Sequence, residues 1–261
     1  MQTVAVDGIP LHYRDVGQGL PVLLLHAFPL DGAAFEQQVA ALSGRYRFIV
    51  PDLRGFGQSR RGEGPTEMRQ LAQDALVLLD ALNIDAAVVG GVSMGGYAAM
   101  ALLREDAGRV RGLVLVDTQC TADDDAGREK REATAKQALS EGTPSVVQGL
   151  VPKLVHAGPD SPVGREVMAM GLAASPQAIA AAQRGMALRL DSKDLLARFA
   201  GPTLVVVGEH DTVTPVAKAK QMVDLVQGAR LEIIAGAAHL PNQEQPEAFN
   251  AVLDAFLASL S

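Results

Sequence analysis

The sequence predicts an α/β fold with a mostly parallel central sheet flanked by helices, and three observations support this prediction. Uninterrupted apolar runs are typical of strands that a parallel sheet buries on both faces, and six occur here, at residues 21–28, 47–52, 86–91, 111–118, 202–211 and 229–236. Amphipathic segments separate most of these runs, and such alternation is typical of α/β proteins. The alternation stops between the fourth and fifth runs, which indicates a helical insertion there.

The segments around these runs fit the same architecture. An Asp7-Gly8 pair between two short β-type runs predicts an N-terminal hairpin, because Asp-Gly is a favoured two-residue hairpin turn. The clearest helix is expected over residues 66–83, where apolar side chains recur with helical spacing at Met68, Leu71, Ala75, Leu78, Leu79 and Leu82.

The insertion begins at about Gln119 and extends to about Phe199. It contains no convincing buried strand and predicts several helices rich in alanine and methionine, separated by breaks that contain glycine or proline. The predicted organisation is therefore an α/β core formed by residues 1–118 and 202–261, with a short helical cap, residues 119–201, inserted between the two parts.

Composition and charge limit the classes of function. The 261 residues carry a net charge of −7 without a block of Lys or Arg, so binding to nucleic acid is not expected. No apolar stretch approaches the roughly 18–20 residues of a membrane helix, and the N-terminus shows no signal-peptide pattern, so we expect a cytoplasmic protein without a membrane partner. Cys120 is the only cysteine, and neither an HExxH motif nor a Cys/His cluster is present, so we expect neither a disulfide, a metal nor a cofactor.

A G-x-S-x-G pattern lies where a predicted strand meets a predicted helix, with Ser93 between Gly91 and Gly95. This is the context of a nucleophile elbow, a sharp turn in which the flanking glycines remove side chains that would collide. The N-terminus of the following helix favours negative charge near the serine. We predict that Ser93 is a catalytic nucleophile; the alternative is that it only caps the helix after a tight turn.

A serine nucleophile needs a base and a carboxylate that orients the base, and sheets of this kind supply them in the order Ser, acid, His. Of the five histidines, His239 alone follows the last apolar run and precedes the final helix, so it is the predicted base. Asp211 and Asp117 both follow strands, where active-site residues of open α/β sheets gather. We favour Asp211 as the acid, and Asp117 is the alternative.

An acyl-transfer site also needs N–H donors for the oxyanion that forms on the substrate. We predict the backbone N–H groups of Met94, next to the nucleophile, and of Phe28, in the loop after an early strand. We expect apolar contacts to the substrate from Met168 and Met186 of the insertion and from Leu240 beside the predicted base. The helical spacing of the two methionines equally permits a place in the core of the cap.

Five segments resemble the motifs of the α/β-hydrolase superfamily, over essentially the whole chain: HAFP at 26–29, PDLRGFGQS at 51–59, GVSMG at 91–95, GEHDTVTP at 208–215 and GAAHLPNQEQPEAF at 236–249. Within it, the chain looks most similar to bacterial carboxylesterases related to 3-oxoadipate enol-lactonases. Ala27 departs from the family pattern, which has Gly at that position. The resemblance argues against the dehalogenases and epoxide hydrolases of this fold, whose nucleophile is Asp.

The residues and the resemblance imply a serine hydrolase that cleaves carboxylic esters of short to medium acyl chain through an acyl-enzyme, with a small-molecule ester as its partner. Four alternatives share the fold: an enol-lactonase, a carbon–carbon bond hydrolase, a perhydrolase or cofactor-free haloperoxidase, and a ligand receptor with slow turnover. They differ in the side chains of the cap. No oligomeric state follows from the sequence.

Overall fold

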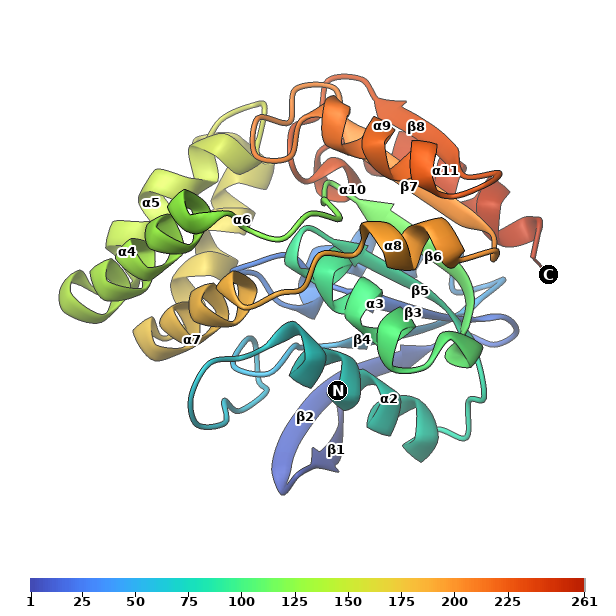
Figure 1. Cartoon of the computed structure of the whole chain (residues 1–261), viewed down its shortest axis with the longest axis horizontal. Coiled ribbons are helices and arrows are strands. Elements are labelled where there is room, and N and C mark those ends of the chain that lie inside the picture. Colours follow the sequence, from blue (N-terminus) through green and yellow to red (C-terminus); the bar gives the residue numbers. More distant parts are fainter. Residues whose placement is uncertain (261) are drawn as a thin grey trace.

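An eight-stranded sheet forms the centre of the computed structural model, which describes residues 1–260 (Figure 1). The strands lie in the order β1-β2-β4-β3-β5-β6-β7-β8. β1 and β2 are antiparallel to their neighbours and all other pairs are parallel, which confirms the predicted fold class. The strands are β1 (Gln2–Val6), β2 (Ile9–Val16), β3 (Pro21–Leu25), β4 (Arg47–Pro51), β5 (Ala87–Val92), β6 (Val110–Val116), β7 (Thr203–Gly208) and β8 (Arg230–Ile234).

The two edges of the sheet differ from its buried centre. At the antiparallel edge, Asp7 and Gly8 turn the predicted hairpin with φ of 50° and 75°, the left-handed values that a two-residue hairpin turn requires. In the centre, β5 and β7 are buried along their whole length, as strands covered on both faces should be. β8 is an exception among the apolar runs, because it pairs with β7 alone at the other edge, and its Ile233 is 46% exposed.

Helices cover both faces of the sheet. α1 packs with α11, α2 packs with α3, and α8 packs with α9; the last four lie together in front of the sheet in Figure 1. No helix of residues 1–260 is both long enough and apolar enough to span a bilayer. The helices of the core are α1 (Glu36–Leu42), α2 (Met68–Ala81), α3 (Met94–Glu105), α8 (Lys193–Arg198), α9 (Val216–Leu225), α10 (Pro241–Glu244) and α11 (Pro246–Ala258), with 3-10 turns at Gly32–Phe35 and Ala107–Arg109.

The loop after β4 is fixed by two buried acids. Asp74 of α2 accepts two hydrogen bonds from the Arg54 guanidinium, at 2.8 and 2.5 Å, and both side chains are buried. Asp52 accepts the backbone N–H groups of Gly32 and Gln58, each at 2.9 Å. The segment that carries the PDLRGFGQS motif is therefore held between the sheet and α2.

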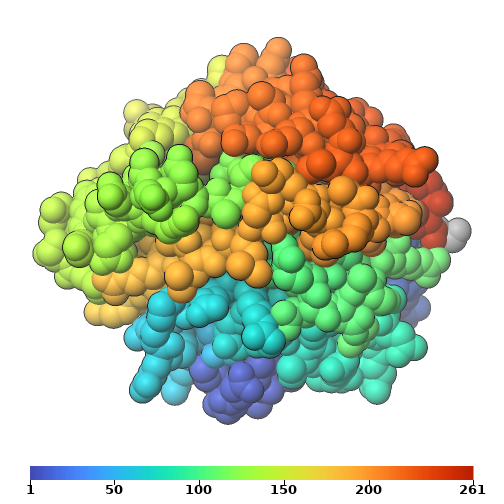
Figure 2. All heavy atoms as spheres, viewed as in Figure 1, coloured from blue at the N-terminus to red at the C-terminus, as the bar shows by residue number. Residues whose placement is uncertain are grey.

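The helices of the predicted cap lie at one end of the core, on the left in Figure 1, and are α4 (Asp125–Glu141), α5 (Thr143–Leu154), α6 (Pro162–Ala173) and α7 (Pro176–Ala187). α4 and α7 pack along each other, and both bury alanines, whose small side chains permit a close approach. A paired Arg184 and Glu132 also join the two helices through bonds of 2.8 Å. In the space-filling view, cap and core form one continuous surface (Figure 2).

The two connections between cap and core are tied to each other. Arg189, on the returning connection, donates to the Thr121 carbonyl at 3.0 Å and to the Asp123 carboxylate at 2.7 Å, both on the outgoing connection. One step further, the Ser192 N–H donates to the Cys120 carbonyl at 2.7 Å. These contacts hold the base of the cap at a defined position on the core.

Candidate active site

Ser93 lies on the sharp turn between β5 and α3, at the carboxyl edge of the sheet. Its backbone has φ 52° and ψ −110°, a conformation that costs a non-glycine residue on the order of 1–3 kcal/mol. β6 and the residues after it hold this turn, because the Ser93 N–H donates to the Val116 carbonyl and the Thr118 hydroxyl donates to the Ser93 carbonyl, each at 2.9 Å. The Ser93 side chain remains partly exposed, and its hydroxyl bonds to no residue of the described chain.

Three glycines make the turn sterically possible. A Cβ on Gly91 would lie 2.1 Å from the Gly95 carbonyl group, and a Cβ on Gly95 would lie 1.9 Å from the Leu25 oxygen. A Cβ on Gly96 would lie 2.6 Å from the Thr118 side chain. All three contacts are shorter than real Cβ atoms tolerate, so the glycine pattern noted in the sequence is required by the close approach of α3 to β3 and β6.

His239 and Asp211 come together from the loops after β8 and β7. Their Nδ1 and Oδ2 atoms are 2.8 Å apart, and both side chains are buried. Asp211 also accepts the Val213 and Thr214 N–H groups at 2.7 and 3.1 Å and the Thr214 hydroxyl at 2.6 Å. Because an ionised carboxylate only accepts hydrogen bonds, Nδ1 carries a proton, and in the neutral ring Nε2 then has the lone pair that a general base requires.

The hydrogen bonds around Asp211 decide its charge. Burial by itself raises the pKa of the carboxyl, but the hydrogen bond and charge of His239, together with the Thr214 hydroxyl, hold that pKa well below its ordinary value. Asp211 is therefore ionised near neutral pH and can stabilise a positive charge on the imidazole.

The structure brings Asp117 to the same place, at the end of β6. Its Oδ1 accepts the Gly208 N–H at 2.9 Å, and its side chain makes no hydrogen bond to His239. Ligand atoms of Asp117, Asp211 and His239 lie within 4.8 Å of one another, the spacing of a possible metal site. The direct His239–Asp211 hydrogen bond accounts for the approach of those two residues without an ion. The geometry thus supports Asp211, not Asp117, as the partner of the histidine.

Two backbone N–H groups border the turn. Met94 is the first residue of α3, so the helix itself provides no acceptor for its N–H. Phe28 lies in the loop after β3, and none of the loop hydrogen bonds within residues 1–260 uses its N–H. α3 packs directly on β3, so this loop and the helix N-terminus lie at the same edge of the sheet.

His26 fixes the loop that carries Phe28. The Leu53 N–H donates to His26 Nε2 at 2.9 Å, so the ring proton is on Nδ1 and points to the Ala27 carbonyl, also at 2.9 Å. Burial lowers the pKa of His26, which agrees with a neutral ring. His26 therefore connects the Phe28 loop to the loop after β4, and its role is structural.

The loop that carries His239 is tied to the cap, a feature that the sequence analysis missed. The His239 N–H donates to the carbonyl of Leu154, the last residue of α5, at 3.0 Å. Beside it, the Glu244 carboxylate accepts the Ala238 N–H at 2.8 Å and the His156 N–H at 2.6 Å. We call these contacts the cap tether. The one residue of the cap tether that the sequence could have pointed to is Glu244, a charged side chain that closely follows His239.

Comparison with known proteins identifies the family. The pattern of the alpha/beta hydrolase fold matches residues 21–246, which is most of the chain. The chain belongs to the α/β-hydrolase family.

Three of the proteins to which this α/β hydrolase is similar are named as esterases or enol-lactonases. A thermophilic esterase from Thermogutta terrifontis, solved with malate bound, is 37% identical with a TM-score of 0.96 and covers 100% of this chain and 99% of its own. The enol-lactonase from Burkholderia xenovorans is 27% identical with a TM-score of 0.91, over 98% and 100% of the two chains. The 3-oxoadipate enol-lactonase 1 of Acinetobacter baylyi is 31% identical over 252 residues, which are 92% of this chain and 89% of that protein. The resemblance expected from the motifs is confirmed, and the protein is a hydrolase.

The side chains predicted to contact substrate in this hydrolase occupy different places. Met168 is half-buried on α6, whereas Met186 is 3% exposed and accepts a hydrogen bond from Arg131 of α4 on its sulfur, inside the packing of the cap. Leu240 is buried next to His239. A Cβ on Gly171 of α6 would lie 3.5 Å from Pro29, so α6 passes close to the Phe28 loop.

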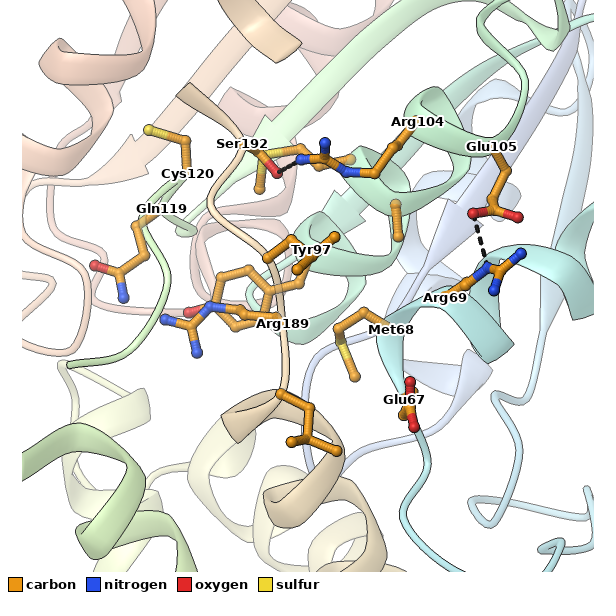
Figure 3. Close-up of a pocket in the computed structure, with 14 residues that line it drawn as sticks. Glu67, Met68, Arg69, Tyr97, Arg104, Glu105, Gln119, Cys120, Arg189 and Ser192 are labelled. Carbon is orange, nitrogen blue, oxygen red and sulfur yellow. Dashed lines mark hydrogen bonds and ion pairs between the residues drawn. The ribbon is translucent and has the colours of Figure 1, made fainter. Parts of the chain in front are cut away.

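Two hollows of the hydrolase lie outside the turn at Ser93. One, of about 180 Å³, lies between α2, α3 and residues 188–192, and Cys120 is also part of its lining. In it the Arg189 guanidinium stacks on the Tyr97 ring at 4.4 Å (Figure 3). The other, of about 450 Å³, lies between the end of α5 and the Asp211 loop, where His156 and His210 stack at 4.0 Å. Neither is lined by Ser93 or His239.

Proposed function

We propose that this α/β hydrolase cleaves carboxylic esters of short to medium acyl chain with the triad Ser93, His239 and Asp211. One observation carries the proposal: a serine held in a strained turn at a helix N-terminus shares the carboxyl edge of the sheet with a histidine that an ionised aspartate orients. This combination is what acyl transfer by an activated serine needs.

The mechanism uses each group in turn. His239 Nε2 accepts the Ser93 hydroxyl proton as the oxygen attacks the acyl carbon, and Asp211 stabilises the resulting imidazolium. The Met94 and Phe28 N–H groups donate to the oxyanion, a contact whose loss typically costs 10²–10³ in rate. The imidazolium then protonates the leaving alcohol, and His239 activates a water that releases the acid and restores Ser93.

The preference for shorter acyl chains is supported by the position of the cap. α6 passes close to the Phe28 loop, and the cap tether holds the end of α5 against the His239 loop. Since Phe28 and His239 belong to the proposed site, we expect these helices to limit the space above Ser93. Each methylene of an acyl chain gains about 0.8 kcal/mol only while it enters an apolar pocket. We expect kcat/KM to rise from acetate toward chains of about eight carbons or fewer and then to fall.

Purified protein tested on p-nitrophenyl esters from acetate to palmitate checks both parts of the proposal. Ser93→Ala should lower kcat by a factor on the order of 10⁴–10⁶, and a serine-directed phosphonate should add one group, at Ser93. A Ser93→Ala protein that keeps more than a tenth of the activity contradicts the mechanism. A steady rise through palmitate contradicts the chain-length preference alone.

An enol-lactonase is the second candidate, and the names of the Acinetobacter baylyi and Burkholderia xenovorans relatives favour it. The same residues would open a cyclic enol ester, so Ser93→Ala does not separate the two candidates. Steady-state kinetics with 3-oxoadipate enol-lactone beside the ester panel does. A kcat/KM for the lactone at least 100 times that of the best simple ester would assign the lactonase.

A further inference from the structure

Asp117 has an oxygen without a hydrogen-bond donor in the interior of the protein. The residue is 1% exposed, and its backbone has φ 41°, a value that Asp and Asn tolerate better than other non-glycine residues. Oδ1 accepts the Gly208 N–H at 2.9 Å, whereas no donor of the described chain reaches Oδ2. A buried carboxylate oxygen without a donor is costly, so this atom requires an explanation.

The charged groups near Asp117 are unfavourable for a second carboxylate. Its carboxyl interacts directly with that of Asp211, and Glu244 adds a further negative field. Ligand atoms of Asp211, His239 and Asp117 lie within 4.8 Å of one another, and of the two carboxylates His239 bonds only to that of Asp211. No arginine or lysine pairs with Asp117 among the ion pairs of the described chain. Two ionised carboxylates in this place would repel each other with little screening.

One proton relieves both problems, and the hydrogen bonds decide which carboxyl holds it. Asp211 accepts four hydrogen bonds, from His239, Thr214 twice and Val213, all of which stabilise its charged form. Asp117 accepts a single one. The proton therefore belongs on Asp117, whose Oδ2 becomes a donor aimed at Asp211.

We propose that Asp117 is a protonated positioning residue that donates a hydrogen bond to the Asp211 carboxylate and so keeps a single negative charge behind His239. The inference rests on the proposed function, because it assigns Asp211 as the acid of the triad. Burial, followed by the charge of Asp211 and the hydrogen bond to it, raises the pKa of Asp117 well above its ordinary value, in agreement with this state. The extra donor holds Asp211 in place without adding charge.

Substitution by asparagine and by glycine tests the positioning role. Asp117→Asn keeps the shape, tolerates the positive φ and always presents a donor, so it should keep at least about a third of the wild-type kcat on p-nitrophenyl butyrate. Asp117→Gly adopts the same φ without strain but removes the donor, and it should lose at least tenfold, the lower end for a hydrogen bond to a charged group. An Asn variant as impaired as the Gly variant, or a Gly variant as active as wild type, overturns the proposal.

The protonation state is tested without activity, by following the His239 ring signal by NMR against pH in wild type and Asp117→Asn. If Asp117 is neutral, the midpoint of the His239 titration is the same in both proteins. If Asp117 were ionised, removing a full charge within 4.8 Å would lower that midpoint by about two and a half pH units at an effective dielectric constant of about 20. A shift of that size overturns the proposal.

The two measurements also separate this inference from the proposed function. Absent ester hydrolysis together with an unchanged His239 midpoint would contradict the proposed substrate class and leave the protonated Asp117 supported. Ester hydrolysis that depends on Ser93, together with a shifted His239 midpoint, would support the proposed function and contradict the protonated Asp117.

Discussion

Ser93→Gly is expected to make the protein more stable while it removes the nucleophile. Ser93 has φ 52° and ψ −110°, which is close to the mirror image of the extended conformation that L-residues prefer. Glycine has no Cβ and adopts both hands with similar ease. The hydroxyl makes no hydrogen bond within the described chain, and the side chain is partly exposed, so its removal leaves neither an unpaired partner nor a buried cavity.

The expected size follows from two opposing terms. The strained conformation costs about 1–3 kcal/mol in a non-glycine residue, and glycine regains this amount. Against it, glycine adds conformational freedom to the unfolded chain, which costs about 0.5–1 kcal/mol relative to alanine. Ser93→Gly should therefore exceed Ser93→Ala in stability by about 1 kcal/mol, or about 2–4 °C in Tm for a chain of this length.

Urea and thermal unfolding of wild type, Ser93→Ala and Ser93→Gly measure the difference, because the alanine variant keeps the strain and loses the hydroxyl. Ala133, exposed in the middle of α4, provides a matched control. Ala133→Gly changes the same atoms at ordinary helical φ and should destabilise by about 1 kcal/mol. A Ser93→Gly protein less stable than Ser93→Ala, with the control behaving as expected, would refute the claim that strain is stored in this turn.

Three further outcomes are expected. Asp211→Asn should lower kcat by a factor on the order of 10⁴, because the amide favours the wrong imidazole tautomer, and a loss under tenfold would contradict the assignment. Arg54→Met should lower the free energy of unfolding by about 3–5 kcal/mol in urea, because Asp74 is left buried without its partner; a loss under 1 kcal/mol would contradict this. Asp117 keeps a proton in the folded state that the unfolded chain loses above about pH 4, since burial and Asp211 raise its pKa. Wild-type stability should therefore fall as pH rises from about 4 toward that raised pKa, by up to about 1.4 kcal/mol per pH unit. The free energy of unfolding of Asp117→Asn should depend less on pH over the same range. An identical pH dependence in both proteins would contradict the proton on Asp117.

The features that could be predicted from the sequence depend on local constraints. The elbow at Ser93 is recognisable because the close approach of α3 demands glycine at Gly91 and Gly95, and this demand is visible as a spacing. The order of strands and helices is visible for a similar reason, since burial on both faces selects apolar runs. The predicted strand over 21–28 is longer than β3, which ends at Leu25. The next residue, His26, uses its ring to hold the following loop through Ala27 and Leu53.

The features that could not be predicted join segments far apart in the chain. The sequence does not show that Leu154 provides an acceptor for the His239 N–H, because a backbone carbonyl has no residue signature. The relation between Asp117 and Asp211 was equally hidden. Both follow strands, and only the packing of β6 beside β7 shows that the two carboxyls meet and that one of them has four donors. The division into core and cap at residues 119 and 201 stays a prediction.

The cap tether connects the end of α5 to the loop of the proposed base, His239. A lid that lifts to admit substrate would pull the Leu154 carbonyl from the His239 backbone and the His156 N–H from Glu244. If His239 is the base, it is correctly placed only while the end of α5 stays against the core, and we then expect substrate to enter beside α6 and α7. We therefore expect relatives with different substrates to differ mainly in the side chains of α6 and α7. An exchange of the whole cap between relatives would succeed only where the end of α5 is transplanted in register with its new histidine loop.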